Sequence, residues 1–267
     1  MTLENLLEKL GFDDSLSKAI ICTDDGLGDK EFTFFARALT DKSEYENAEK
    51  RLIARLLPDE RGIKALKVML KTSLYSYKLY EQKGISSDVF FATMKCFKRF
   101  CDESKKEKGY YVFDRSFWVG RQLSLSLFRL GELEYELYSD GKVKDVALHV
   151  PSDADLSPEK IDASLYFANE FIKEHYPDFY GARYVMTSWL LSPILPSLLP
   201  ENSKIVKFFE RFNLLETKPS DEYKFWVYGD SNVNPEDFSE NTRLQRSLKD
   251  YVLAGNTFLE GFGELKR

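Results

Sequence analysis

The chain has 267 residues, of which 43% are hydrophobic and 31% charged, a composition typical of a soluble globular protein with one large domain or two ordinary ones. The formal net charge of −6 disfavours a nucleic-acid or anionic-membrane partner. No segment reaches the apolar length that spans a bilayer, and the start MTLENLLEKL is an amphipathic, acid-bearing stretch unlike a signal peptide. We therefore predict a cytoplasmic protein that binds neither nucleic acid nor membrane.

The cysteines and histidines argue against a metal centre. The three cysteines are Cys22, Cys96 and Cys101, and their spacing fits neither a Cys-x-x-Cys redox site nor a zinc site. The only histidines are His149 and His175, which excludes a multi-histidine site. We predict free thiols in a reducing compartment and no metal.

Residues 1–108 show the spacing of helices. Leu3, Leu6, Leu7 and Leu10 repeat at the helical period, and Gly11 follows as a stop. Further helices are predicted in YENAEKRLIARLLPDE, IKALKVMLKTSLYSYKLYEQKG and VFFATMKCFKRFCDESKKEKG. The acidic segment 22–32 lacks the spacing of a calcium loop and is predicted to be a linker. The first predicted domain, 1–108, is therefore all-helical.

From residue 109 the pattern changes to the period of strands. Gln122–Phe128 and Gly131–Tyr138 alternate, and a hairpin signal at Ser139–Gly141 precedes Lys142–Val150, which predicts a three-stranded antiparallel meander. After it we predict, in order, a helix from Pro158, a strand at Tyr184–Leu191, a helix near Ser203–Phe212, a possible strand at Tyr223–Gly229 and a closing helix at Asn241–Gly255. This order predicts an α+β domain with a mixed sheet over 109–267.

The connection between Val150 and Pro158 leads from a strand into a helix. Ser157 can cap that helix, and Pro158 fits its first position. A helix N-terminus presents unpaired backbone N–H groups, which often hold phosphate. Asp153 and Asp155 lie in the same connection and would oppose an anion. The pattern predicts either an anion-binding turn or only a turn.

Four stretches of the second half resemble a known family. They are WVGRQ from Trp118 with the following RLGELEYE, then LHVPSDADLSPEKIDASL, then SWLLSP, and finally SKIVKFFERF with TRLQRSLKDYVLAGN. Together they span about 140 residues and resemble the C-terminal GNAT-like domain of a bacterial acyltransferase family, which couples it to a helical N-terminal acyltransferase domain. The resemblance implies an α+β chain: an all-helical N-terminal domain followed by a GNAT-like mixed-sheet domain. It also implies transfer of an acyl group from acyl-CoA or acetyl-CoA to an amine or hydroxyl of a small-molecule or peptide acceptor.

The resemblance also implies where CoA binds. In the GNAT fold two parallel strands splay apart around the pantetheine arm, and by topology these are Asp145–Val150 and Tyr184–Leu191. The next connection holds the pyrophosphate, although this one lacks the family's glycines between Pro151 and Ser164. The implied CoA-binding residues are Leu148, Val150, Ser152, Asp155, Ser157, Lys160 and Ser188.

Acyl transfer to an amine needs a base. Glu132, Glu134 and Glu136 share one face of a predicted strand, which indicates either a solvated face or a base, with Glu134 preferred. His149, near the end of its strand, is either a structural histidine or a group that acts as a base or binds the acceptor.

The acid departs from the family pattern. The family's tyrosine falls on Phe209, which cannot donate a proton. Either Tyr223 or Tyr228 substitutes, with Tyr228 preferred, or water is the acid, or the reaction is absent. A second hypothesis follows from Phe209 and the glycine-free connection: a GNAT-like module that binds a ligand or partner without catalysis. A third is a carbohydrate-binding protein that uses Trp118, Trp189 and Trp226.

Overall fold

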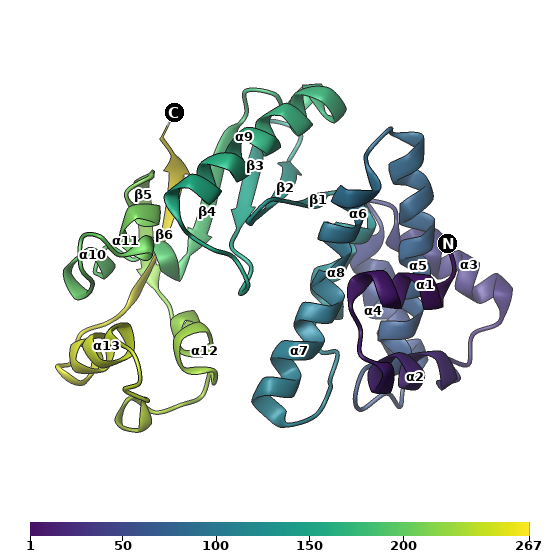
Figure 1. The fold of residues 1–267 in the computed structure, drawn as a ribbon, viewed down its shortest axis with the longest axis horizontal. Helices are drawn as coiled ribbons and strands as arrows, with labels where there is room; N and C mark the ends of the chain where they lie inside the picture. The colour runs from purple at the N-terminus through teal and green to yellow at the C-terminus, as the bar shows by residue number, and fades with distance from the viewer. Residues whose placement is uncertain (267) are drawn as a thin grey trace. The chain divides into compact units, whose positions relative to one another are not determined.

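The computed structural model describes residues 1–266 and divides the chain into a first unit, Met1–Leu130, and a second unit that begins at Gly131 (Figure 1). The boundary predicted from the sequence lay earlier, after residue 108. Residues 109–130 belong to the first unit and bond to α5 (Ile63–Gln82) and to the turn that precedes it. The Phe113 N–H donates to the Arg61 carbonyl over 2.9 Å, and the Ser76 hydroxyl donates to the Leu123 carbonyl over 2.7 Å.

The first unit is helical. Its elements are α1 (Leu3–Leu10), α2 (Asp14–Cys22), α3 (Asp29–Leu39), α4 (Tyr45–Leu56), α5 (Ile63–Gln82), α6 (Ser87–Met94), α7 (Cys96–Lys108), α8 (Ser116–Leu123) and the strand β1 (Leu127–Leu130). In α1 the local sequence sets both ends of the helix. The Thr2 side chain accepts from the Asn5 N–H at its start, and Gly11 closes its end in the left-handed conformation. The 20-residue α5 supplies much of the core, with buried residues along its length.

Two predictions in this unit need correction. The single helix predicted in VFFATMKCFKRFCDESKKEKG is divided at Lys95 into α6 and α7. The strand predicted at Gln122–Phe128 is wrong, because Gln122 and Leu123 complete the last turn of α8. Leu125 then adopts a left-handed backbone, with φ 55°, before β1 begins. The alternating segment QLSLSLF therefore contains the end of α8, a turn and the start of β1, and is not one strand.

The second unit is an α+β domain. Its elements are β2 (Leu133–Ser139), β3 (Lys144–His149), α9 (Pro158–His175), η1 (Pro177–Phe179), β4 (Arg183–Ser188), η2 (Trp189–Leu191), α10 (Leu195–Leu198), α11 (Lys204–Phe209), β5 (Phe212–Pro219), α12 (Glu222–Tyr228), η3 (Pro235–Asp237), α13 (Arg243–Leu253) and β6 (Leu259–Leu265). The strands are ordered β2-β3-β4-β6-β5. The β3–β4 pair is parallel and the other pairs are antiparallel, so the sheet is mixed, as predicted.

The helix α9 covers one face of this sheet (Figure 1). On that face Tyr135 and Leu148 are paired across β2 and β3 and are both buried. The Ser164 hydroxyl of α9 lies 2.9 Å from the Tyr135 hydroxyl and accepts from the Leu133 N–H over 3.2 Å. These bonds fix the helix against the strand that carries the acidic residues on its opposite face.

Several predictions in the second unit also need correction. Tyr223–Gly229 is not a strand: it forms α12, and Gly229 ends that helix in the left-handed conformation. The predicted strand Tyr184–Leu191 stops at Ser188, because residues 189–191 turn into a 3₁₀-helix. The sequence did not predict β5 or β6, and β6 follows the helix α13 that was expected to close the chain.

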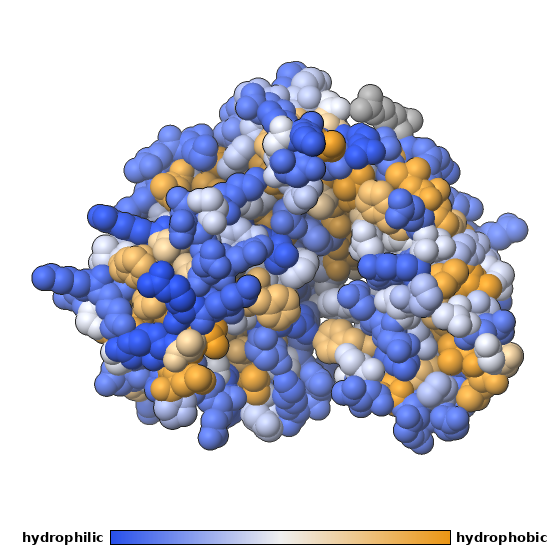
Figure 2. All heavy atoms as spheres, turned by 180° about the vertical axis from the view of Figure 1, so that it is seen from behind, coloured by the Kyte–Doolittle hydropathy of each residue, from blue (hydrophilic) through white to orange (hydrophobic). Residues whose placement is uncertain are grey.

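The surface agrees with the charged composition. Figure 2 shows one face of the molecule, which is mostly hydrophilic with separate hydrophobic patches. Within the described residues 1–266, no helix combines the length and the apolar character needed to cross a bilayer.

Candidate active site

The parallel strands β3 and β4 part at their carboxyl ends. Their pairing runs only from Asp145 opposite Arg183 to Ala147 opposite Val185, although β3 continues to His149 and β4 to Ser188. Each strand keeps its outer neighbour over this last stretch, since β3 still pairs with β2 and β4 with β6. The prediction of two adjacent, parallel strands is confirmed. Two strand edges that face each other without pairing can accept an extended ligand between them.

The amino ends of the same strands are held together. The Arg183 guanidinium donates to both oxygens of Asp145, over 3.0 and 2.8 Å. Such a two-pronged ion pair is directional and fixes the register. The opening between β3 and β4 therefore lies at the carboxyl ends of the strands.

Three candidate residues meet on the sheet face opposite α9. Glu134 lies directly across from His149 in the β2–β3 register. The His149 Nε2 atom lies 2.9 Å from the Glu136 Oε2 atom, with the side chains 27% and 18% exposed. Glu134 is 2% exposed, which rules out a solvated position for it. The structure thus brings an imidazole and two carboxylates together beside the opening between β3 and β4.

In the connection from β3 to α9, the backbone donors of Asp155 and Ser157 are already bonded to carboxylates of the second unit. The Asp155 N–H donates to the Glu132 carboxylate over 2.9 Å. The Ser157 N–H and hydroxyl both donate to the Asp155 carboxylate, over 3.0 and 2.6 Å. The Lys160 N–H donates to the Ser157 carbonyl over 3.0 Å. Hence Ser157 begins α9, but its hydroxyl bonds Asp155 rather than the helix.

Asp155 is the centre of an ion-pair cluster. Lys204 and Lys160 approach its carboxylate to 2.7 and 3.0 Å. The hydrogen bond from Lys204, then those from Ser157 and Lys160, hold the pKa of Asp155 well below its usual range. The position where an anion was predicted therefore carries a carboxylate of the chain itself. Sequence reasoning missed Lys204 because it lies 49 residues from Asp155, on α11.

The other predicted CoA-binding residues surround the opening between β3 and β4. Leu148 is buried on the α9 face, Val150 is half-buried after β3, and Ser152 is exposed in the connection. Ser188 ends β4, and its hydroxyl accepts from the Leu190 N–H over 3.1 Å. The side chains of Leu148 and Ser188 thus serve the fold, and a ligand between β3 and β4 would meet mainly backbone atoms.

Tyr228 and Trp189 pack against a separate hydrophobic cluster formed by Tyr223, Phe238, Leu248 and Phe258. The Tyr228 ring stacks on Phe238 with centroids 3.8 Å apart, and its hydroxyl donates to the Gln245 carbonyl over 2.9 Å. Burial raises the pKa of Tyr228. Trp189 directly follows β4, so the cluster adjoins the carboxyl end of that strand.

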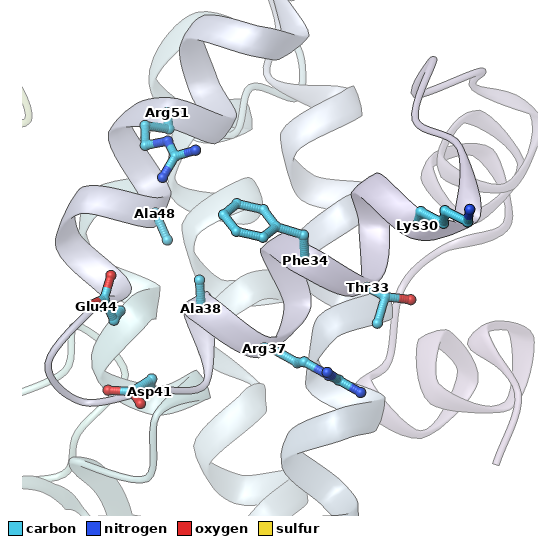
Figure 3. Close-up of a pocket in the computed structure, with 9 residues that line it drawn as sticks. All are labelled: Lys30, Thr33, Phe34, Arg37, Ala38, Asp41, Glu44, Ala48 and Arg51. Carbon is cyan, nitrogen blue, oxygen red and sulfur yellow. The ribbon is translucent and has the colours of Figure 1, made fainter.

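A pocket of about 460 Å³ lies in the first unit between α3 and α4 (Figure 3). The Phe34 ring, 49% exposed, is part of its lining, and the Arg51 guanidinium lies 5.1 Å from the ring centroid. Its lining contains neither histidine nor cysteine. We assign this pocket no chemistry. Over the described residues 1–266, no group of histidine, cysteine and acidic side chains is arranged to hold a metal ion.

Comparison with known families agrees with this geometry. Residues 1–125 match the N-acyltransferase N-terminal domain, and residues 127–265 match the GNAT-like C-terminal domain. The chain belongs to the family of two-domain GNAT-like acyltransferases, which confirms the resemblance seen in its sequence. Its class is that of acyl-CoA-dependent acyltransferases.

Solved structures share the fold over almost the whole chain. An acyltransferase in complex with CoA and 10C-teicoplanin is 21% identical, with a TM-score of 0.80 over 98% of this chain and 87% of that one. An acyltransferase mutant in complex with octanoyl-CoA is 20% identical, with the same TM-score and coverage. An acyltransferase in complex with decanoyl-CoA and teicoplanin is 20% identical, with a TM-score of 0.70 over 100% of both chains. A search of curated proteins found no match.

Proposed function

We propose that the protein transfers an acyl group from acyl-CoA to an amine of a small-molecule or peptide acceptor. The observation that carries this proposal is the parting of β3 and β4 beside His149. A pantetheine arm that lies between the two strands would bring its thioester toward the strand ends. Two of the similar structures hold octanoyl-CoA or decanoyl-CoA, which supports an acyl chain of medium length. Two hold 10C-teicoplanin or teicoplanin, which supports a small-molecule or peptide acceptor.

In the proposed reaction His149 is the general base. It takes a proton from the acceptor ammonium, and the neutral amine then attacks the thioester carbonyl. The new C–N bond forms and the C–S bond breaks. The attacking nitrogen then loses its second proton, which the departing CoA thiolate takes up. Glu134, directly across from His149, is the alternative base. Tyr228 can act as the acid only if its hydroxyl leaves the Gln245 carbonyl.

CoA is proposed to extend along the carboxyl ends of β3 and β4. The backbone near Leu148, Val150 and Ser188 would hold pantetheine. The phosphates would lie at Ser152, Asp155, Ser157 and Lys160, where Lys204 adds a second cation. For the setting we propose the cytoplasm of a bacterium, which the three free cysteines support because disulfides are rare there.

The test is a transfer assay. The protein is incubated with acetyl-, octanoyl- or decanoyl-CoA and a panel of primary amines, and acylated product is detected by mass spectrometry. We expect product with the parent chain and a loss of kcat of about 100-fold or more in His149→Gln, the range that general-base catalysis supplies. His175→Gln is the matched control, because His175 is the chain's other histidine.

The non-catalytic alternative makes a different prediction. Asp155 already fills the expected anion position, which favours a module that has lost the chemistry. Such a module would bind a ligand, or CoA itself, without forming product from any acyl-CoA. Equal rates in the parent and in His149→Gln would contradict the proposed base.

A further inference from the structure

The contact between Glu136 and His149 bears on the state of the imidazole. Glu136 lies opposite Ala147 in the β2–β3 register, so it is the diagonal neighbour of His149 on the same sheet face. At 2.9 Å the Glu136 Oε2 and His149 Nε2 atoms are at hydrogen-bond distance. Both side chains are largely shielded from solvent, which strengthens such a bond.

We infer that Glu136 is a positioning residue for His149, holding its Nε2–H and leaving Nδ1 as the basic nitrogen. This inference rests on the proposed function for its catalytic meaning. An ionised carboxylate only accepts hydrogen bonds, so the imidazole nitrogen that faces it must carry the hydrogen. A neutral imidazole has a single N–H, and its lone pair is then on Nδ1.

The proton balance of the step follows from this tautomer. The acceptor ammonium gives its proton to Nδ1, and the imidazole becomes an imidazolium with an N–H on both nitrogens. The Glu136 carboxylate stabilises this cation through the bond it already makes. When the C–N bond forms, the attacking nitrogen gives its second proton to the departing CoA thiolate, directly or through water, and the imidazolium releases its own proton to solvent. Glu136 stays ionised throughout and bonds no substrate atom.

Glu136→Gln tests the inference, because the amide keeps the shape but either accepts from Nε2 or donates to it, so it no longer selects one tautomer. We expect kcat to fall about 10- to 100-fold, the cost typical of losing such a supporting residue, with the KM for acyl-CoA unchanged. Glu136→Asp keeps the charge and should restore part of kcat. Glu174→Gln, next to His175, is the matched control. If Glu136→Gln raised the KM for acyl-CoA and left kcat unchanged, the inference would be overturned.

Nuclear magnetic resonance gives a readout that needs no substrate. With two histidines in the chain, ¹⁵N-labelled imidazole signals are assigned by comparison with His175→Gln. We expect the Nε2–H tautomer for neutral His149 in the parent and a mixture in Glu136→Gln. An Nδ1–H tautomer in the parent would overturn the inference even if Glu136→Gln did not fold. If the parent catalyses no transfer but shows the Nε2–H tautomer, the proposed function fails while the positioning by Glu136 stands.

Discussion

Asp155 controls whether the β3–α9 connection can bind an anion. Its carboxylate accepts from the Ser157 N–H and neutralises Lys160 and Lys204, the groups that a phosphate would otherwise engage. A CoA phosphate must therefore displace this carboxylate or bind beside it.

Asp155→Asn should tighten CoA binding several-fold at low salt. The substitution removes a negative charge from the site and leaves Lys160 and Lys204 for the phosphate. The gain should shrink with added salt, because exposed charges are screened. Calorimetric titration measures it, with Asp153→Asn as the control in the same connection. Weaker binding in Asp155→Asn would mean that the carboxylate organises the CoA site.

The Tyr228→Phe variant tests whether Tyr228 is the catalytic acid or only stabilises the fold. The hydroxyl is committed to the Gln245 carbonyl, so its removal should cost about 1 kcal/mol of stability and leave kcat unchanged. Thermal unfolding and the transfer assay measure the two effects. A large fall in kcat without a change in stability would instead support the predicted acid.

The cysteines should differ in reactivity. Cys22 is exposed, whereas Cys96 and Cys101 are buried, and burial raises the pKa of Cys101 to about 12. Because the thiolate is the reactive form, we expect a thiol reagent at pH 8 to label one cysteine in the native protein and all three after unfolding. Rapid labelling of a second native cysteine would contradict this burial.

At the scale of elements, β6 lies against η2 with no room for a side chain at Gly261. A Cβ there would come within 2.2 Å of the Leu191 carbonyl oxygen and 2.5 Å of the Leu214 Cδ1 atom. At Gly263 the nearest atoms are at 3.0 Å or more. Close packing at Gly261 thus couples the interior strand β6 to the turn that follows β4.

Gly261→Ala should therefore destabilise the protein by about 1–3 kcal/mol, the usual cost of overpacking. Gly263→Ala is the matched control and should cost less, because its closest neighbour is the end of the flexible Leu191 side chain. Urea unfolding measures both. Equal losses would show that strand propensity, rather than the close approach to Leu191, sets the cost.

The sequence predicted elements best where one face is buried. The strand β2 alternates between the α9 face and the acidic face, and its pattern was visible in GELEYELY. In contrast, β5 is exposed along nearly its whole length, so it has no alternation to detect. The aromatic run YKFWVYG favoured a strand, but its packing in the Tyr223 cluster and the Gly229 cap make it the helix α12.

The candidate site was predictable in part for a similar reason. Glu134 was named from the alternation of GELEYELY and His149 from its place near the end of a predicted strand, and the register pairs the two. The bond between His149 and Glu136 depends on the diagonal of a register, and the Asp155–Lys204 pair depends on how α11 packs. Neither contact has a local signature in the sequence.

At the scale of the whole molecule, the boundary between the units has a testable consequence. Residues 109–130 contribute Val119, Leu123, Phe128 and Leu130 to the core, and Gly120 lies against the Tyr45 ring. A fragment 1–130 should therefore unfold cooperatively, whereas 1–108 should melt at a lower temperature or lack a transition. Circular dichroism measures both fragments. Equal melting temperatures for the two fragments would show that the first unit ends at residue 108.

The strand β5 is the last strand of the sheet in the order β2-β3-β4-β6-β5, and it exposes Leu214 and Leu215. An open strand edge with apolar side chains tends to recruit strands of other molecules. Here Leu215 is an extra residue at the shift between Leu214 and Glu216, and Lys218 and Pro219 end the strand. A bulge, a lysine and a proline each hinder the pairing of a further strand with this edge. We therefore expect the edge to resist intermolecular sheet formation, and concentrated solutions of the protein to stay free of fibrils.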